Sequence, residues 1–177
     1  MAIYLITGNP NKLRELQAIF PQSLGLVAKK LDLPEIQSLD LHEIVRRKLH
    51  DAYAQVKAPV IVEDVSAELE VLNGLPGPFM KFFEERMGKS ALYDLSHEGA
   101  RAKIICAMAY FDGERELVVD GIVTGTITAP RSGEGFGFDY VFVPDGHDHT
   151  FSEMGLAKKN SISHRYRAAT ALSKLLG

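Results

Sequence analysis

The segment AIYLITGNPNKLRELQAIF, Ala2 to Phe20, decides the fold. It begins with a short apolar run, Ala2 to Thr7, that stops at Gly8-Asn9-Pro10-Asn11, a cluster typical of tight turns. Apolar residues then recur at helical spacing after Lys12, and we expect Asn11 to cap this helix. The segment therefore predicts a buried strand, a polar turn and a helix in direct succession.

The rest of the chain predicts further helices and a second kind of strand pairing. An apolar stripe from Leu41 to Val56 indicates a long amphipathic helix. Two β-type runs, 102–111 and 117–128, flank Asp112-Gly113-Glu114-Arg115, a hairpin signature that implies antiparallel strands. We therefore expect an α/β fold with a mixed central β-sheet flanked by helices, in a single domain that spans residues 1–177.

The composition limits the partners that the protein can have. Twenty Lys and Arg residues against 23 Asp and Glu residues give a net charge of −3, which provides no global positive field for nucleic acid. No stretch reaches the roughly 18 apolar residues of a membrane span, and the N-terminus does not resemble a secretion signal. The single cysteine, Cys106, lies in an apolar run, which fits a buried thiol in a reducing compartment. We expect a cytoplasmic protein that binds neither nucleic acid nor membrane.

The turn ITGNPNK, Ile6 to Lys12, combines groups that favour phosphate. It is expected to present unpaired backbone N–H groups at a helix N-terminus, with a hydroxyl on Thr7, an amide on Asn9 and an ammonium on Lys12. It is not a Walker A loop, because the second glycine and the Lys-Ser/Thr pair are missing. Taken alone, the turn is therefore either a phosphate site or a plain capped turn.

Three acids are candidate metal ligands. The apolar run Val60 to Val62 stops at Glu63-Asp64, so we expect a buried strand that ends there and delivers two carboxylates. Carboxylates in such a position can bind Mg²⁺ and orient or deprotonate water, whereas the alternative is a solvated strand end. Glu35, which has the apolar neighbours Leu33 and Ile36, is either a further ligand or a surface loop charge.

Two later segments can complete a nucleotide site. The run Lys158 to Arg165 is expected to place positive charge at the start of a helix, where the helix dipole disfavours it unless an anion binds. The loop GEGFGFD, Gly133 to Asp139, interleaves glycines with two phenylalanines that can stack on a base. It is not a Rossmann fingerprint, because it leads into a strand instead of a helix. A solvated basic face and ordinary core aromatics are the alternatives.

These segments, in this order, resemble the inosine triphosphate pyrophosphatase family over essentially the whole chain. The resemblance implies hydrolysis of non-canonical purine nucleoside triphosphates (ITP, dITP and XTP) to the nucleoside monophosphate and pyrophosphate. It also implies Mg²⁺ as cofactor, a homodimer, and two lobes with the active site in the cleft between them. The six motifs that carry the resemblance are ITGNPNK (6–12), LPEIQ (33–37), VED (62–64), GLPGPFMK (74–81), FGFD (136–139) and KNSISHR (159–165).

The resemblance further implies roles for individual residues. Asp64 would activate the attacking water, and Mg²⁺ would be held by Glu35 and Asp64, with Glu63 as an additional ligand. The groups that would bind the polyphosphate are Thr7, Gly8, Asn9, Lys12, Lys48 and Lys81. The groups that would form the base pocket, or close over base and phosphates, are Phe136, Gly137, Phe138, Asp139, Lys159, His164 and Arg165.

The sequence departs from the family pattern beside the base pocket and after the acids. Phe138 stands where relatives usually carry Tyr or Trp, and Tyr140 stands where they carry Pro. Val65 to Glu68 follows Asp64, where many relatives have a Ser-Gly pair. Two rival functions are therefore kept: a nucleoside triphosphate pyrophosphatase with a different or broader base preference, and a nucleotide-binding module without turnover.

Overall fold

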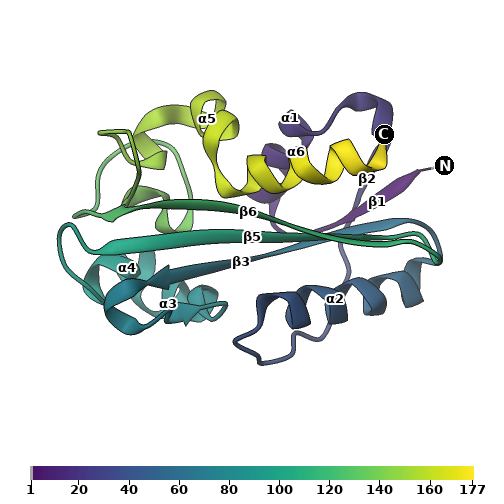
Figure 1. The fold of residues 1–177 in the computed structure, drawn as a ribbon, viewed down its shortest axis with the longest axis horizontal. Helices are drawn as coiled ribbons and strands as arrows, with labels where there is room; N and C mark the ends of the chain where they lie inside the picture. Colours follow the sequence, from purple (N-terminus) through teal and green to yellow (C-terminus); the bar gives the residue numbers. More distant parts are fainter. Residues whose placement is uncertain (1) are drawn as a thin grey trace. The chain divides into compact units, whose positions relative to one another are not determined.

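The computed structural model describes residues 2–177 (Figure 1). Within this range no helix combines the length and the apolar character that crossing a bilayer requires. The strands are β1 (Ile3–Ile6), β2 (Leu26–Lys29), β3 (Val60–Leu69), β4 (Pro76–Gly77), β5 (Arg101–Phe111), β6 (Glu116–Ile127) and β7 (Phe142–Pro144). The α-helices are α1 (Pro10–Ile19), α2 (Leu41–Val56), α3 (Met80–Met87), α4 (Ala91–Asp94), α5 (Phe151–Ile162) and α6 (His164–Leu176). Short 3-10 turns are η1 (Gln22–Leu24), η2 (Glu70–Leu72), η3 (Gly88–Ser90) and η4 (Gly137–Tyr140).

The strands of residues 2–177 form one seven-stranded sheet in the order β2-β1-β3-β5-β6-β7, with β4 paired to β3. β1 is parallel to both β2 and β3, whereas the pairs β3–β4 and β6–β7 are antiparallel. β5 and β6 are neighbours joined by residues 112–115, a connection too short for parallel strands, as the hairpin signature predicted. The predicted α/β fold with a mixed sheet flanked by helices is confirmed.

Backbone contacts divide the chain into two compact units. Unit 1 contains residues 2–64, 106–121 and 165–177, and unit 2 contains residues 65–105 and 122–164. The strands β3, β5 and β6 contribute residues to both units. The single domain and the cleft between two lobes stay predictions.

Unit 1 is built on the parallel strands β2, β1 and β3. In Figure 1, α2 lies on one side of these strands, and α1 and α6 lie on the other. The apolar stripe of α2 is buried as predicted, because helical spacing places its members on one face. Side chains from every layer are at most 1% exposed, among them Leu5, Leu16, Leu49, Ile61 and Leu172. The elements that carry the acids and the turn are therefore anchored by one apolar core.

Unit 2 carries the FGFD loop and residues 159–164 of the KNSISHR segment, whose last residue, Arg165, belongs to unit 1. Its helices are α3, α4 and α5, and its strands β4 and β7 pair antiparallel with β3 and β6. Its core cluster includes Leu69, Met80, Leu92, Ile104, Phe142 and Phe151, each at most 4% exposed. The aromatic members stack closely, since the Phe142 and Phe151 ring centroids are 5.3 Å apart.

The predicted end of a strand at Glu63-Asp64 is wrong, because β3 continues to Leu69. Ser66 and Ala67, which give little apolar signal in the sequence, are fully buried and allow the strand to continue. The two acids therefore lie inside a strand, where successive side chains point to opposite faces. This geometry separates Glu63 from Asp64.

The predicted cap of the first helix is also wrong, because Asn9 and not Asn11 caps α1. Asn9 has an extended backbone, and its Oδ1 accepts the N–H groups of Asn11 at 2.9 Å and Lys12 at 3.4 Å. Pro10 occupies the first helical position, where its fixed φ suits the helix and its missing N–H costs nothing. The helix therefore begins immediately after Asn9.

Candidate active site

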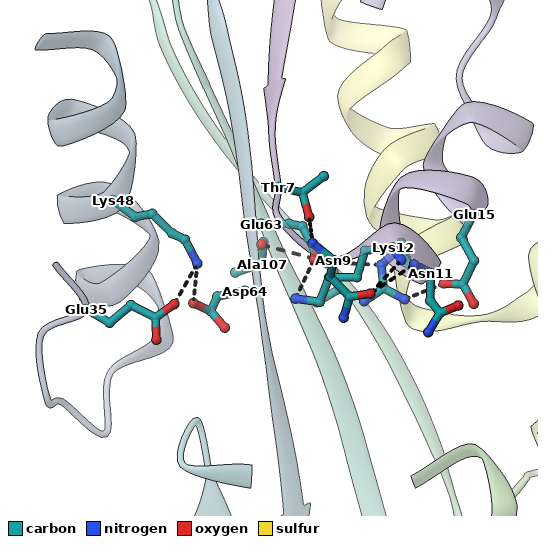
Figure 2. A network of polar contacts seen from close by, with 12 residues as sticks. Thr7, Asn9, Asn11, Lys12, Glu15, Glu35, Lys48, Glu63, Asp64 and Ala107 are labelled. Carbon is teal, nitrogen blue, oxygen red and sulfur yellow. Dashed lines mark hydrogen bonds and ion pairs between the residues drawn. The ribbon is translucent and has the colours of Figure 1, made fainter. Parts of the chain in front are cut away.

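The turn between β1 and α1 is held by its own side chains (Figure 2). Thr7 Oγ1 accepts the N–H of Asn9 at 3.1 Å, and Asn9 in turn caps α1. The expectation of unpaired N–H groups is therefore wrong for Asn9, Asn11 and Lys12. The turn still offers an anion three things: the Thr7 hydroxyl hydrogen, the Lys12 ammonium and the positive end of a helix.

Lys12 belongs to a buried network centred on Glu63, drawn in Figure 2. Lys12 Nζ lies 2.6 Å from Glu63 Oε1, and Arg165 Nε donates to Glu63 Oε2 at 3.1 Å. Arg165 Nη1 also donates to Glu15, which lies on α1 with Lys12. The side chains of Arg165, Glu63 and Glu15 are each 2% exposed. Two acids and two bases balance here, which is the condition for burying charges.

These contacts fix the ionisation state of Glu63. Burial alone raises the pKa of its carboxyl, but Arg165 and Lys12 outweigh burial and hold the pKa well below the ordinary value of 4.5. Cys106 Sγ donates to Glu63 Oε2 at 3.2 Å, and burial followed by the Glu63 charge raises the pKa of this thiol. Glu63 is thus an ionised carboxylate paired with both Lys12 and Arg165, and its role as a metal ligand stays a prediction.

Asp64 lies on the opposite side of β3 from Glu63, together with Lys48 of α2 and Glu35 (Figure 2). Lys48 Nζ is 3.1 Å from Asp64 Oδ2 and 3.3 Å from Glu35 Oε1. Desolvation lowers the pKa of Lys48, but Asp64 and Glu35 outweigh it, and the pKa rises above its ordinary value. The Asp64 and Glu35 side chains are 21% and 41% exposed, so solvent reaches this cluster. Sequence reasoning placed Lys48 against phosphates, and the structure places it between the two acids.

The Asp64–Glu35 pair fits a divalent cation. Two carboxylate oxygens converge within 3.3 Å of a single positive atom, so both face one small space that a cation already occupies. Within residues 2–177 no group of three or more His, Cys, Asp or Glu side chains is arranged to hold a metal ion. Mg²⁺ needs no such cage, because it is usually held by one or two carboxylates together with waters and substrate phosphates. The donor set therefore suits Mg²⁺ in the presence of a polyphosphate.

A second cluster lies in unit 2 and joins the FGFD loop to the KNSISHR segment. Asp139 Oδ2 is 2.5 Å from Lys159 Nζ, in an ion pair whose side chains are 2% and 4% exposed. The same oxygen accepts the Phe136 N–H at 3.0 Å, and Lys159 Nζ lies 4.5 Å from the centroid of the Phe136 ring. The pair is charge-balanced and almost fully buried beside the aromatic ring, and its part in a base pocket stays a prediction.

The predicted placement of the basic run at the start of one helix is wrong for Lys159. Ser163 leaves the helical conformation, with a ψ of 163°, so the run is divided between the end of α5 and the start of α6. Lys159 lies in the last turn of α5, where the helix dipole favours positive charge. Its charge is matched by Asp139 and does not by itself require a bound anion.

The loop before β7 has little room. His164 packs near Phe138, with ring centroids 5.6 Å apart. Gly137 has a φ of +59°, and a Cβ at this position would come within 2.5 Å of the Glu84 carboxylate. The contact is with the flexible end of the Glu84 side chain, so it is the positive φ that favours glycine at this position.

The remaining site residues divide into one untested prediction and two omissions. Lys81 lies exposed in the first turn of α3, and its predicted phosphate contact stays a prediction. Sequence reasoning assigned no role to Glu15, although it lies one helical turn after Lys12, or to Phe151. Phe151 is fully buried: its ring centroid lies 5.7 Å from Lys159 Nζ and 6.2 Å from the centroid of the His164 ring. The helical spacing was the one available signal for Glu15.

A hollow of about 440 Å³ lies elsewhere in unit 2. The residues predicted for the site do not line it. Its two basic groups are paired, since Lys103 meets Glu68 at 2.7 Å and Arg101 meets Asp145 at 2.6 Å. The hollow therefore shows no chemistry comparable with that of the two clusters.

The fold and the clusters define a mixed α/β protein in which a strand–turn–helix motif carries a lysine, and the next strand carries one of a pair of convergent carboxylates. The chain belongs to the Ham1 family, whose sequence pattern it matches over residues 3–175.

Named relatives agree with this family. The chain is 40% identical over 171 residues to an inosine triphosphate pyrophosphatase of Batrachochytrium dendrobatidis, covering 94% of this chain and 90% of the relative. It is 36% identical over 179 residues to an inosine triphosphate pyrophosphatase of Schizosaccharomyces pombe, covering 99% of this chain and 95% of the relative.

Solved structures share the fold. A HAM1 protein from Coxiella burnetii superposes with a TM-score of 0.81 at 26% identity, over 99% of this chain and 98% of the other. A nucleoside-triphosphatase, described as a dITP/XTP pyrophosphatase, from Mycobacterium abscessus superposes with a TM-score of 0.72 at 26% identity, over 97% and 98%.

Proposed function

We propose that this chain hydrolyses non-canonical purine nucleoside triphosphates (ITP, dITP and XTP) to the nucleoside monophosphate and pyrophosphate, with Mg²⁺ as cofactor. The observation that carries the proposal is that Asp64 and Glu35 converge on one cationic group. Asp64 directly follows Glu63 in β3, and Glu63 forms the ion pair with Lys12. Membership of the Ham1 family and the names of its relatives support the same activity.

The residues of the turn in unit 1 bind phosphate, and Glu63 supports them. The Thr7 hydroxyl and the Lys12 ammonium bind phosphate oxygens at the start of α1, where the helix dipole adds attraction. Glu63 holds the Lys12 side chain in place through their ion pair. Phosphoryl transfer demands little covalent chemistry from a protein, so positioning and charge are what these groups supply.

Asp64 is the group that orients and deprotonates the attacking water. Its side chain is partly exposed, so water reaches it, and it is fixed by Lys48. Mg²⁺ held by Glu35 and Asp64 would supply neutralisation of phosphate charge and polarisation of phosphate oxygens. Attack at the α-phosphorus breaks the α–β anhydride bond, and pyrophosphate leaves.

The cluster in unit 2 supports a base-binding role. Asp139 and Lys159 provide an acceptor and a donor next to the Phe136 ring. A pocket that donates to the oxygen at purine C6 rejects an amino group there, because the donor is left unpaired at a cost of about 1–3 kcal/mol. Phe138 replaces the Tyr or Trp expected at this place, so base preference is the property most open to change.

The test is a panel of ITP, dITP, XTP, ATP, GTP and CTP incubated with the protein and Mg²⁺, with pyrophosphate and monophosphate measured. We expect turnover of ITP and XTP to exceed that of ATP and GTP by roughly 10²-fold, as one well-placed hydrogen bond allows. Comparable turnover of all six would favour a broad nucleotide pyrophosphatase. Thermal stabilisation by ITP without pyrophosphate would favour a binding module without turnover.

We further propose a cytoplasmic homodimer whose partner is the nucleotide, with no nucleic-acid or membrane partner. The support is the family resemblance for the dimer and the acidic net charge of −3 for the lack of nucleic-acid binding. Sedimentation equilibrium tests the dimer, and a monomer at micromolar concentration would contradict it.

A further inference from the structure

Lys48 lies between the two acids proposed to hold Mg²⁺. Its ammonium lies within 3.3 Å of one oxygen from each of Asp64 and Glu35, the two acids that suit Mg²⁺. An ammonium is a compact point charge on a flexible stem, and its distance to these oxygens exceeds the roughly 2.1 Å of a Mg²⁺–oxygen bond. The ammonium thus lies at ordinary ion-pair distances between the two acids, which would have to move closer together to bind Mg²⁺ directly.

We propose that Lys48 is the resident counter-ion of this site, which a divalent cation must displace before it can bind Asp64 and Glu35. The proposal takes its cation, Mg²⁺, from the proposed function, but the competition itself rests on the geometry of three side chains. Both cations cannot occupy the space together, because like charges a few ångströms apart repel strongly in a partly buried site.

The elements around Lys48 allow the side chain to move without the backbone. Lys48 lies on α2 between residues of a buried stripe, and Val45, Leu49 and Ala52 are all fully buried. The helix is therefore fixed, while the four-carbon stem of Lys48 can carry the ammonium away from the acids. Lys48 is 16% exposed, so the site is not sealed against such a movement.

Displacement of the Lys48 ammonium would couple the binding of the metal to the binding of the nucleotide. When Lys48 leaves the acids it loses two carboxylate partners, and a bound polyphosphate would offer it new anionic ones. Metal alone then binds weakly, and metal with triphosphate binds well, which is a positive coupling between two ligands. Lys48 acts on the metal through the acids, so it is a positioning residue in this role.

The test measures Mn²⁺ binding to the nucleotide-free protein by electron paramagnetic resonance, with Lys48→Met compared with the parent. Removal of the competitor should tighten Mn²⁺ binding about tenfold, the factor expected when an opposing charge leaves a pair of acids in a partly buried site. Lys48→Arg, which keeps the charge, should stay within about threefold of the parent.

The matched control is Arg47→Met, which removes the same charge one residue away. Arg47 pairs with Asp51 on the surface of α2 and contacts neither acid in the pairings found, so its loss should leave Mn²⁺ affinity unchanged within about twofold. If Lys48→Met does not fold, as judged by thermal unfolding, Lys48→Gln replaces it in the same titration.

The outcomes separate this proposal from the proposed function. Mn²⁺ binding to Lys48→Met that is equal to or weaker than that of the parent, or undetectable in both, overturns the counter-ion role. Tighter binding in Lys48→Met supports it, even if the parent proves inactive on every nucleotide in the panel. An active parent with no change in Mn²⁺ affinity would leave the proposed function standing without this device.

Discussion

Glu63 and Asp64 are neighbours in sequence but occupy opposite environments. Glu63 is 2% exposed, lies between Lys12 and Arg165, and has a pKa held well below its ordinary value. Asp64 is 21% exposed and shares one lysine with Glu35. The comparison teaches that a pair of acids in one strand can divide structural and chemical duties, because the strand sends them to opposite faces.

The largest expected effect comes from breaking the buried ion pairs around Glu63. Arg165→Met leaves Glu63 and Glu15 without their shared partner, and removing one member of a buried ion pair costs roughly 3–5 kcal/mol. Urea unfolding should show this loss in the free energy of unfolding. Arg167→Met, an exposed change one half-turn further along α6, serves as the control and should cost less than about 1 kcal/mol. Equal losses in the two variants would mean that the network is not the source.

The second expected effect concerns Asp64, the more exposed of the two acids. Asp64→Asn keeps the shape of the side chain but removes the charge that we propose orients and deprotonates water, so we expect kcat to fall by about 10²-fold or more. The free energy of unfolding should change by less than about 1 kcal/mol, because partly exposed ion pairs contribute little. Pyrophosphate release and urea unfolding, measured on one preparation, check both halves. A variant that hydrolyses ITP at the parent rate would remove Asp64 from the mechanism.

The smallest expected effect is the pH dependence that Glu63 gives to the free energy of unfolding. A carboxyl with a lowered pKa contributes stability that is present above its ordinary pKa of 4.5 and is lost as the pH falls toward the lowered value. The parent should therefore lose stability between pH 5 and pH 3 more steeply than Glu63→Gln, by roughly 1–2 kcal/mol. Urea unfolding across this range tests the sign, and parallel curves for the two proteins would assign the acid sensitivity to other groups.

The sequence predicted most of the fold because its signals are local. The strand–turn–helix from Ala2 to Phe20, the apolar stripe of α2 and the hairpin at residues 112–115 all follow from short-range patterns. The same dependence on local signals explains the errors. Ser66 and Ala67 look like loop residues and hide the continuation of β3, and Pro10 moves the cap from Asn11 to Asn9.

The candidate site was harder to predict because its pairs are distant in sequence. Arg165 meets Glu15 across 150 residues and Glu63 across 102. Nothing near Glu15 in the chain identifies its partner, so its place in the network followed only from the fold. The same holds for Lys48, whose position between two acids depends on how α2 packs against β3.

Cys106 makes the buried network open to direct observation. The chain holds one cysteine, and its thiol is fully buried against Glu63. A thiol reagent can therefore modify Cys106 only when the packing around it opens. The rate of that modification reports, without any added label, how often the centre of the charged network opens to water. Cys106 is thus an intrinsic probe of local unfolding at the buried network of Lys12, Glu63 and Arg165.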